Sequence, residues 1–221
     1  MKTALLVLTF VAAVSPAAFA TDGVIEINQA RALAGEVTVG DTPGFPITIT
    51  ETGSYRLTSN LELGNAQEGI TVLAGDVTID LNGFAIIGSG LPTSVAILGQ
   101  IGANVTVVNG TIRGVNVGVD LATNGARVER VRVSDVSGTA ISVGSDAFVS
   151  GCLVRRAGGR GIQIRRGLVT GNVVMDTGGP ALYVINAAGY SDNAWNNNTG
   201  GYVVGNGLAL GGNLCGAARC P

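Results

Sequence analysis

The sequence contains no histidine, and its only lysine is Lys2. Without histidine, the chain cannot build a Ser-His-Asp triad, a histidine general base or a histidine metal ligand. Any catalysis would have to use carboxylates, arginine or tyrosine. Aromatic residues make up 5% of the chain although 46% of it is hydrophobic. The core is therefore expected to consist of valine, isoleucine, leucine and alanine.

Long hydrophobic runs are absent beyond the first 20 residues. At the N-terminus, Lys2 precedes an apolar run over 4–14 and the small-x-small motif Ala18-Phe19-Ala20. This pattern is typical of a secretory signal peptide, and we predict cleavage after Ala20. The run is shorter than the ~18 residues that a membrane span needs. The sequence therefore predicts a secreted or periplasmic protein with no membrane span.

Cysteine is also scarce, with three residues in the chain. Export to an oxidising compartment permits disulfides. Cys215 and Cys220 enclose four residues near the C-terminus, and we predict a disulfide between them. Cys152 would then remain a buried free thiol with a structural role.

Glycine, in contrast, is abundant, with 35 residues, and it separates the short apolar segments of a sequence repeat. Val128, Val149 and Val169 each begin a phrase in which two apolar residues flank four intervening positions. A fixed period near 20 residues is the signature of a repeat architecture. The phrase recurs at Ile79–Phe84, Val107–Ile112, Tyr190–Trp195 and Leu210–Cys215.

Each repeat has room for two or three short strands divided by glycine and asparagine, but not for a helix. Leucine-rich repeats share the period, yet their Leu-x-x-Leu-x-Leu frame is missing. The sequence therefore predicts an all-β fold, a right-handed single-stranded parallel β-helix of about seven or eight coils. We expect a signal peptide over 1–20, an N-terminal cap with leading strands over 21–69, and a β-helix with a disulfide-closed end over 70–221.

A row of polar residues accompanies the repeat. Stacked asparagines can hydrogen-bond along a solenoid axis, and this row predicts such an asparagine ladder with a cysteine in one of its places. Three positions after the first apolar residue of the phrases stand Asn82, Cys152, Asn172, Asn193 and Asn213.

The run Val77–Gly88, preceded by Gly53-Ser54-Tyr55-Arg56-Leu57, resembles the start of right-handed parallel β-helix proteins of the pectate-lyase-like superfamily. The resemblance covers about Ile47 to Cys215. It implies the fold and leaves open lyases, hydrolases, epimerases, tailspikes and adhesins. The Gly-His-Gly element of the superfamily's hydrolases is absent, and no lyase motif is present.

Charge is unevenly distributed along the chain. Residues 21–112 contain nine acidic residues and two arginines, whereas 113–166 contain nine arginines and four acidic residues. Arginine binds carboxylates through a planar fork of donors, so this band is a candidate site for an acidic polysaccharide. A solvated outer face is the alternative interpretation. The candidate ligand-binding residues are Arg155, Arg156, Arg165, Arg166, Asp135, Asp176 and Tyr183.

The positions of these candidates in the repeat indicate their roles. Asp135, Arg156, Asp176 and Asn197 recur seven positions after the anchors, and they predict an exposed row of alternating charge with a structural role. Tyr183 lies between two inward-facing positions and is expected to face outward, where it could contact a sugar.

We expect a non-catalytic exported module that binds acidic polysaccharide or acts at the cell surface. One alternative is a small polysaccharide lyase or epimerase-like enzyme that uses arginine and aspartate. Another is a structural protein that assembles through the edge of its β-helix; the sequence leaves the oligomeric state open. No cofactor and no nucleic-acid partner are expected. Calcium is possible, because aspartates near expected turns could supply oxygen ligands.

Overall fold

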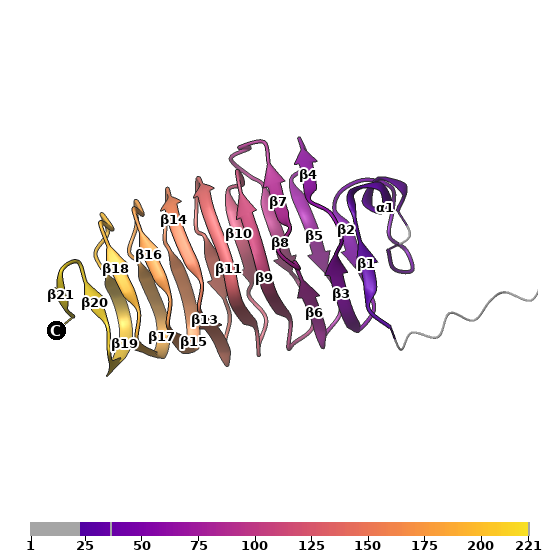
Figure 1. Cartoon of the computed structure of the whole chain (residues 1–221). Helices are drawn as coiled ribbons and strands as arrows, with labels where there is room; N and C mark the ends of the chain where they lie inside the picture. The colour runs from indigo at the N-terminus through magenta and orange to yellow at the C-terminus, as the bar shows by residue number, and fades with distance from the viewer. Residues whose placement is uncertain (1–22, 36, 221) are drawn as a thin grey trace, which may run out of the picture.

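The computed structural model describes residues 23–35 and 37–220 of the chain. The predicted signal peptide and its cleavage site lie outside the described residues. The predicted all-β fold is confirmed, because the chain forms a parallel β-solenoid of about eight turns. Figure 1 shows the coils following one another in sequence order from α1 to the C-terminal hairpin.

The strands form three parallel ladders that run along the solenoid. Ladder A contains β2 (Ile47–Ile49), β5 (Glu68–Val72), β8 (Val95–Gly99), β10 (Val117–Leu121), β12 (Ile141–Val143) and the first parts of β15 (Ile162–Thr170), β17 (Leu182–Ser191) and β19 (Val203–Gly211). Ladder B contains β1 (Ile25–Ile27), β3 (Gly53–Leu57), β6 (Val77–Asp80), the first parts of β9 (Thr106–Arg113) and β11 (Arg127–Val136), then β13 (Ala147–Ser150) and the later parts of β15, β17 and β19.

Ladder C completes each turn. It contains β4 (Leu61–Gly64), β7 (Ala85–Gly88), the later parts of β9 and β11, then β14 (Leu153–Ala157), β16 (Val173–Met175), β18 (Ala194–Asn196) and β20 (Leu214–Cys215). Side chains alternate inward and outward along each strand. Every ladder therefore has one face toward the core and one face toward solvent.

The core consists of apolar columns in which residues of successive coils stack in register. On ladder B, Val107, Val128, Val149 and Val169 pair in turn and are fully buried. Such β-branched side chains suit the pleated surface of a strand. Tyr190 and Trp195 continue the columns near the C-terminal end and are 8% and 1% exposed.

Two of the predicted anchors are wrong. Phe84 is not in the core column of ladder C, because Ile86 pairs with Ile112. The extra residues form a turn in which Phe84 N–H donates to Leu81 O at 2.8 Å. Leu210 is 58% exposed, because a bulge in β19 makes Ala209 the partner of Tyr190.

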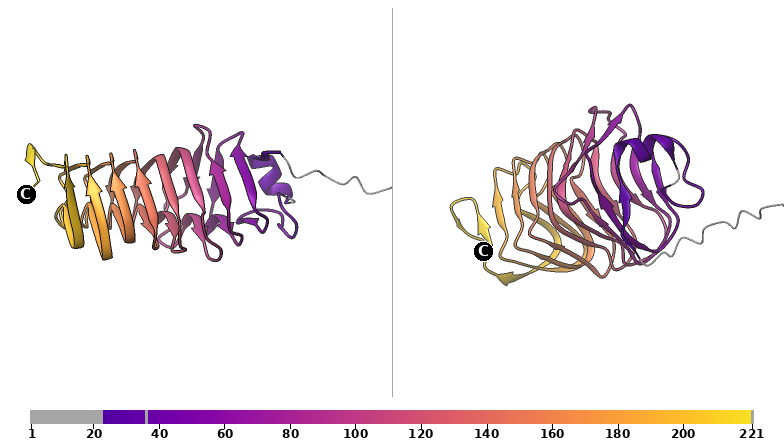
Figure 2. Two further views of the ribbon diagram at one scale, coloured as in Figure 1. Left: turned by 90° about the horizontal axis from the view of Figure 1, so that it is seen from below. Right: turned by 45° about the vertical axis from the view of Figure 1, so that its right-hand side comes forward.

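The N-terminal end is covered by α1 (Gln29–Ala34), as Figures 1 and 2 show. The side chain of Asn28 caps the helix by accepting a hydrogen bond from Arg31 N–H. Gly35, with φ of 78°, ends it. The ladders begin before residue 70, because β1 pairs with β3 and β2 pairs with β5. Strands within 21–69 are therefore already part of the ladders.

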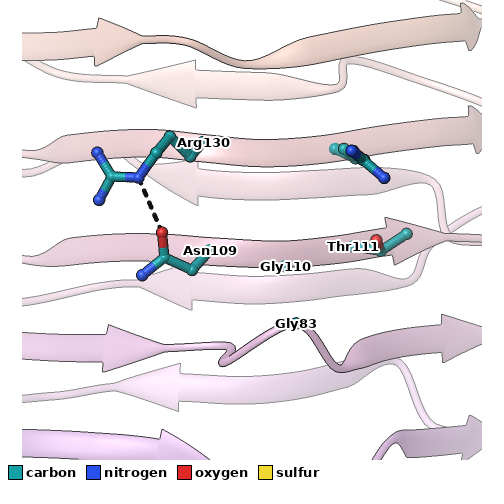
Figure 3. A pocket seen from close by; sticks show the side chains of 6 residues that line it. Gly83, Asn109, Gly110, Thr111 and Arg130 are labelled. Carbon is teal, nitrogen blue, oxygen red and sulfur yellow. Dashed lines mark hydrogen bonds between the residues drawn. The ribbon is translucent and has the colours of Figure 1, made fainter.

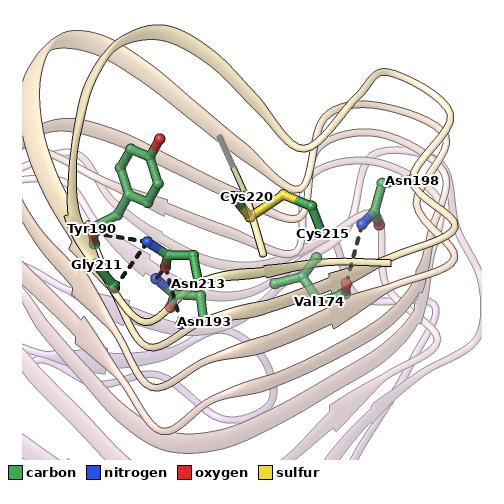
Figure 4. Close-up of a disulfide and its surroundings, with 8 residues drawn as sticks. All are labelled: Val174, Tyr190, Asn193, Asn198, Gly211, Asn213, Cys215 and Cys220. Carbon is green, nitrogen blue, oxygen red and sulfur yellow. Dashed lines mark hydrogen bonds between the residues drawn. A yellow bond between two sulfur atoms is a disulfide. The ribbon is translucent and has the colours of Figure 1, made fainter. Parts of the chain in front are cut away.

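The C-terminal end closes with an antiparallel hairpin of β20 and β21 (Ala218–Arg219). The predicted disulfide is present, and Figure 4 shows Cys215 and Cys220 joined next to the last asparagines of the ladder. Cys152 is buried and free, and burial raises the pKa of its thiol to about 11. In the part of the chain that the structure describes, no helix is long and apolar enough to span a membrane.

Asn172, Asn193 and Asn213 form a buried stack inside the solenoid. Asn193 Oδ1 accepts hydrogen bonds from Asn172 N–H and Nδ2–H, both at 3.0 Å. Asn213 Oδ1 accepts the equivalent pair from Asn193 at 3.1 and 3.0 Å. Cys152 N–H donates to Asn172 Oδ1 at 2.9 Å and begins the stack.

Asn82 does not belong to this stack. It is exposed and has φ of 51°, so it occupies a corner, and its Nδ2–H donates to Leu57 O at 3.1 Å. A corner turns the chain with one residue in the left-handed region, which asparagine, aspartate and glycine tolerate best. Asn82 is therefore a turn residue and not a ladder residue.

Candidate functional site

The structure places three arginines on the outward face of ladder C. Arg113 and Arg155 follow the buried anchors of their coils, and Arg132 precedes the buried Val133. Because inward and outward positions alternate along a strand, all three side chains point to solvent, and all three are exposed. We call Arg113, Arg132 and Arg155 the arginine face.

The register brings these arginines together. Arg113, Ser134 and Arg155 pair in succession in one outward column. Arg132 stands on the same strand as Ser134, two positions before it, and thus in the adjacent outward column. Neighbouring strands lie ~4.8 Å apart. The three arginines therefore come from three consecutive coils: Arg113 and Arg155 occupy the layers on either side of Ser134, and Arg132 lies on the same strand as Ser134.

No ion pair or side-chain hydrogen bond within the described residues involves these three arginines. The nearest corner arginines, in contrast, are paired. Arg130 Nε–H donates to Asn109 Oδ1 at 2.9 Å, and its Nη1 lies 3.3 Å from a Glu129 oxygen. The arginine face is thus a positive surface that the described residues leave without paired carboxylates.

A hollow of about 300 Å³ adjoins the arginine face. It is lined by Gly83, Asn109, Gly110, Thr111, Arg130 and Arg132. Figure 3 shows the chain bulging at Gly83, in the turn that the extra residues before Ile86 create. A Cβ atom added at Gly83 would meet no atom within 4 Å, so the hollow is open to solvent on the side of Gly83. The hollow is a shallow depression with two arginines at its rim.

Arg130 and Arg156 have unusual backbones, with φ of 54° at both. Every other non-glycine residue with positive φ in the described chain is asparagine or aspartate. Arginine gains little from this conformation by itself. Each guanidinium instead binds the residue at the same corner one coil earlier, Asn109 or Asp135. These contacts fix both guanidinium groups at the borders of ladder C.

The row predicted from Asp135 to Asn197 is present at the corner that follows ladder C. Arg156 donates from Nε and Nη2 to both carboxylate oxygens of Asp135, at 2.6 and 2.8 Å. Asn197 Nδ2–H donates to Asp176 Oδ1 at 2.8 Å. The hydrogen bonds from Arg156 lower the pKa of the Asp135 carboxyl to about 2. This row is satisfied internally, which favours the structural interpretation of Asp135 and Asp176.

Asp135→Asn should reveal this pairing through pH. Because the folded pKa lies below the ordinary value of 3.8, the ionised carboxylate stabilises the fold above pH 3.8, and this contribution disappears as pH falls through about 2. We expect the variant to melt up to about 3 °C below the parent at neutral pH, since exposed pairs contribute little.

Melting curves measured from pH 7 down to pH 2 check this, and the two curves should converge at the acidic end. Asparagine keeps the corner conformation, so backbone strain does not enter the comparison. Arg156→Gln should give the same pH dependence. A difference that persists unchanged at pH 2 would contradict the pairing.

The other candidate residues lie elsewhere. Arg165 and Arg166 stand at the corner between ladders A and B, where Arg166 pairs with Asp146 at 2.8 Å. Tyr183 is on the outward face of ladder A as predicted, but the guanidinium of Arg160 lies 4.0 Å from its ring centroid and covers one face. The predicted group of Arg155, Arg156, Arg165 and Arg166 therefore does not form one surface.

Sequence reasoning missed Arg113 and Arg132 as a group with Arg155. The available signal was their alternation with the buried anchors, because residues on either side of an inward anchor must face outward on the same ladder.

No three Asp, Glu or Cys side chains among the described residues gather where they could hold a metal ion. In comparisons with known proteins, no family model, curated protein or solved structure matches this chain.

Proposed function

We propose that this protein binds an acidic polysaccharide without catalysis, through the arginine face. The observation that carries the proposal is the set of three exposed arginines on consecutive coils of ladder C, without ion-pair partners among the described residues. Arginines that pair with carboxylates, such as Arg156 and Arg166, stabilise the corners. Those of the arginine face are available to an external anion.

The geometry suits an extended polymer. Side chains on a ladder recur every ~4.8 Å along the solenoid, so they present cations in a row instead of around a point. Arginine can bind each carboxylate with two parallel hydrogen bonds. Partly exposed Leu153, Val173 and Met175 continue the outward columns beyond Arg132 and Arg155. Their apolar surface can pack against the faces of sugar rings.

A non-catalytic role is the better-supported one. The carboxylates nearest the arginine face are engaged, Asp135 with Arg156 and Glu129 with Arg127 and Arg130. The lyase or epimerase alternative would need an aspartate, as well as an arginine, that is free to act beside its substrate. The resemblance to the pectate-lyase-like superfamily and the secretory leader belong to the same proposal, and they favour a polyuronate met outside the cytoplasm.

Binding to polygalacturonate and to alginate tests the proposal. The variant Arg132→Gln/Arg155→Gln keeps the outward side chains but removes two charges. If each exposed contact contributes about 0.7 kcal/mol, affinity should fall about ten-fold. Parent binding should also weaken steeply as salt rises from low to physiological ionic strength.

Arg165→Gln is the matched control. Arg165 is exposed, its side chain has no partner among the described residues, and it lies at the corner between ladders A and B, away from the arginine face. Because Arg165→Gln removes one charge, it is compared directly with the single variant Arg132→Gln. Equal losses in these two single variants, or no binding to either polymer by the parent, would overturn the proposal. Release of unsaturated uronates, followed by absorbance, would instead favour the lyase alternative.

A further inference from the structure

The last coil leaves a strand edge open. Strand β19 pairs with β17 on one side, and no strand among the described residues pairs with its other side. Its sequence, Val-Val-Gly-Asn-Gly-Leu-Ala-Leu-Gly, contains no charged residue and no proline. Proteins usually protect such an edge with lysine, proline or an inward-pointing charge. Here the strand itself carries none of these protections.

Exposed apolar side chains gather at the same end. Five of the nine exposed large hydrophobic residues in the described chain belong to the last two coils, and the opposite end is covered by α1. An end that presents both unpaired backbone groups and apolar side chains favours pairing with another strand. The five residues are Ile185, Val204, Leu208, Leu210 and Leu214.

The C-terminal hairpin obstructs this end. Strand β20 pairs with β18 on one side and with β21 on the other, so β21 fills the next layer of ladder C. The disulfide and the hydrogen bond from Cys220 N–H to Asn213 O at 3.0 Å hold it there. Figure 4 shows the disulfide over the end of the solenoid. Another full coil stacked on β19 and β20 would need the layer that β21 occupies.

We propose that the disulfide-closed hairpin is a guard that keeps the open edge of β19 from pairing with a second copy of this chain. Without the guard, two copies would pair tail to tail. Strand β19 bends at Gly205, where φ is 98°, as it passes from ladder A to ladder B. A two-fold axis at Gly207, two residues after this bend, lays the ladder A part of one copy over the ladder B part of the other.

This arrangement fits the strand's sequence. A two-fold axis makes the paired strands antiparallel and the interface closed, which limits assembly to a dimer. It sets Val204 opposite Leu210 of the partner subunit and brings no like charges together. The N-terminal end cannot serve in the same way, because α1 covers it.

Light scattering after size exclusion tests the inference. The parent should be a monomer, and Cys215→Ser/Cys220→Ser should form a dimer whose fraction rises with protein concentration. Adding Leu208→Lys, at an edge residue that is 67% exposed, should restore the monomer. Adding Ile101→Lys should not, because Ile101 is similarly exposed, at 60%, but lies in the loop after β8.

A parent that is already dimeric through β19 would overturn the guard. So would a doubly substituted variant that keeps its far-UV spectrum and stays monomeric up to its solubility limit, or equal effects of Leu208→Lys and Ile101→Lys. If the double variant does not fold, a chain that carries Cys215→Ser and ends at residue 215 removes the guard completely and is measured in the same way. These readouts do not depend on polysaccharide binding.

Discussion

Asn193→Ala should lower the melting temperature by about 10 °C. The side chain is 1% exposed and makes four hydrogen bonds. Its Oδ1 accepts two from Asn172, and its Nδ2 donates to Val169 O and to Asn213 Oδ1, all at 3.0 Å. Alanine would leave the buried N–H of Asn172 without its acceptor. An unsatisfied buried group costs about 1–3 kcal/mol, and the cavity and remaining lost bonds bring the total to about 3–5 kcal/mol.

Thermal melting followed by far-UV circular dichroism checks this, at about 2–4 °C per kcal/mol for a chain of this size. Asn196→Ala is the matched control. It makes the same chemical change three residues later, at an exposed position on ladder C for which no side-chain hydrogen bond is present among the described residues. Its melting temperature should stay within about 2 °C of the parent. Equal shifts in both variants would contradict the conclusion that the hydrogen bonds of the stack stabilise the fold.

The asparagine stack was predictable because residues that are one sequence period apart lie in successive layers of a solenoid. Residues at one offset from the anchor meet in space as long as each coil has the same length. From Val149 onward the coils keep their length to within a residue, so Asn172, Asn193 and Asn213 align. The prediction that Asn82 belongs to the stack was wrong because the coil of Ile79 is longer. Seven positions separate Ile79 from Ile86, against five from Val107 to Ile112.

The candidate site was only partly predictable, because the sequence does not show where each strand ends. The sequence places Arg155 and Arg156 next to each other, yet one faces outward on ladder C and the other turns a corner with φ of 54°. A charge count along the chain cannot separate these roles, because it ignores where each strand ends. The hollow beside Arg132 depends on the two extra residues at Gly83. Their backbone path follows from pairing with the next coil and not from local sequence.

Gly167→Ala should cause the largest loss of stability among these substitutions. Gly167 has φ of 143°, and an added Cβ would lie 1.9 Å from Ala147 O. That oxygen belongs to the backbone of β13, which pairs with β15 at this residue. The neighbour cannot move aside without breaking the ladder. We expect a loss on the order of 4–5 kcal/mol or more, seen as a melting temperature at least 10 °C below the parent or as failure to fold.

Gly171 separates this clash from backbone strain. Its φ of 66° is also left-handed, but the nearest atom to an added Cβ is Gly151 N at 3.9 Å. Gly171→Ala should therefore cost only the left-handed penalty of about 1–2 kcal/mol. Gly171→Asn should melt near the parent, because the corresponding corners of other coils use Asn109 and Asp192. If Gly167→Ala and Gly171→Ala melt alike, close contact between coils does not limit which residues the corners accept, and glycine is there for its backbone freedom alone.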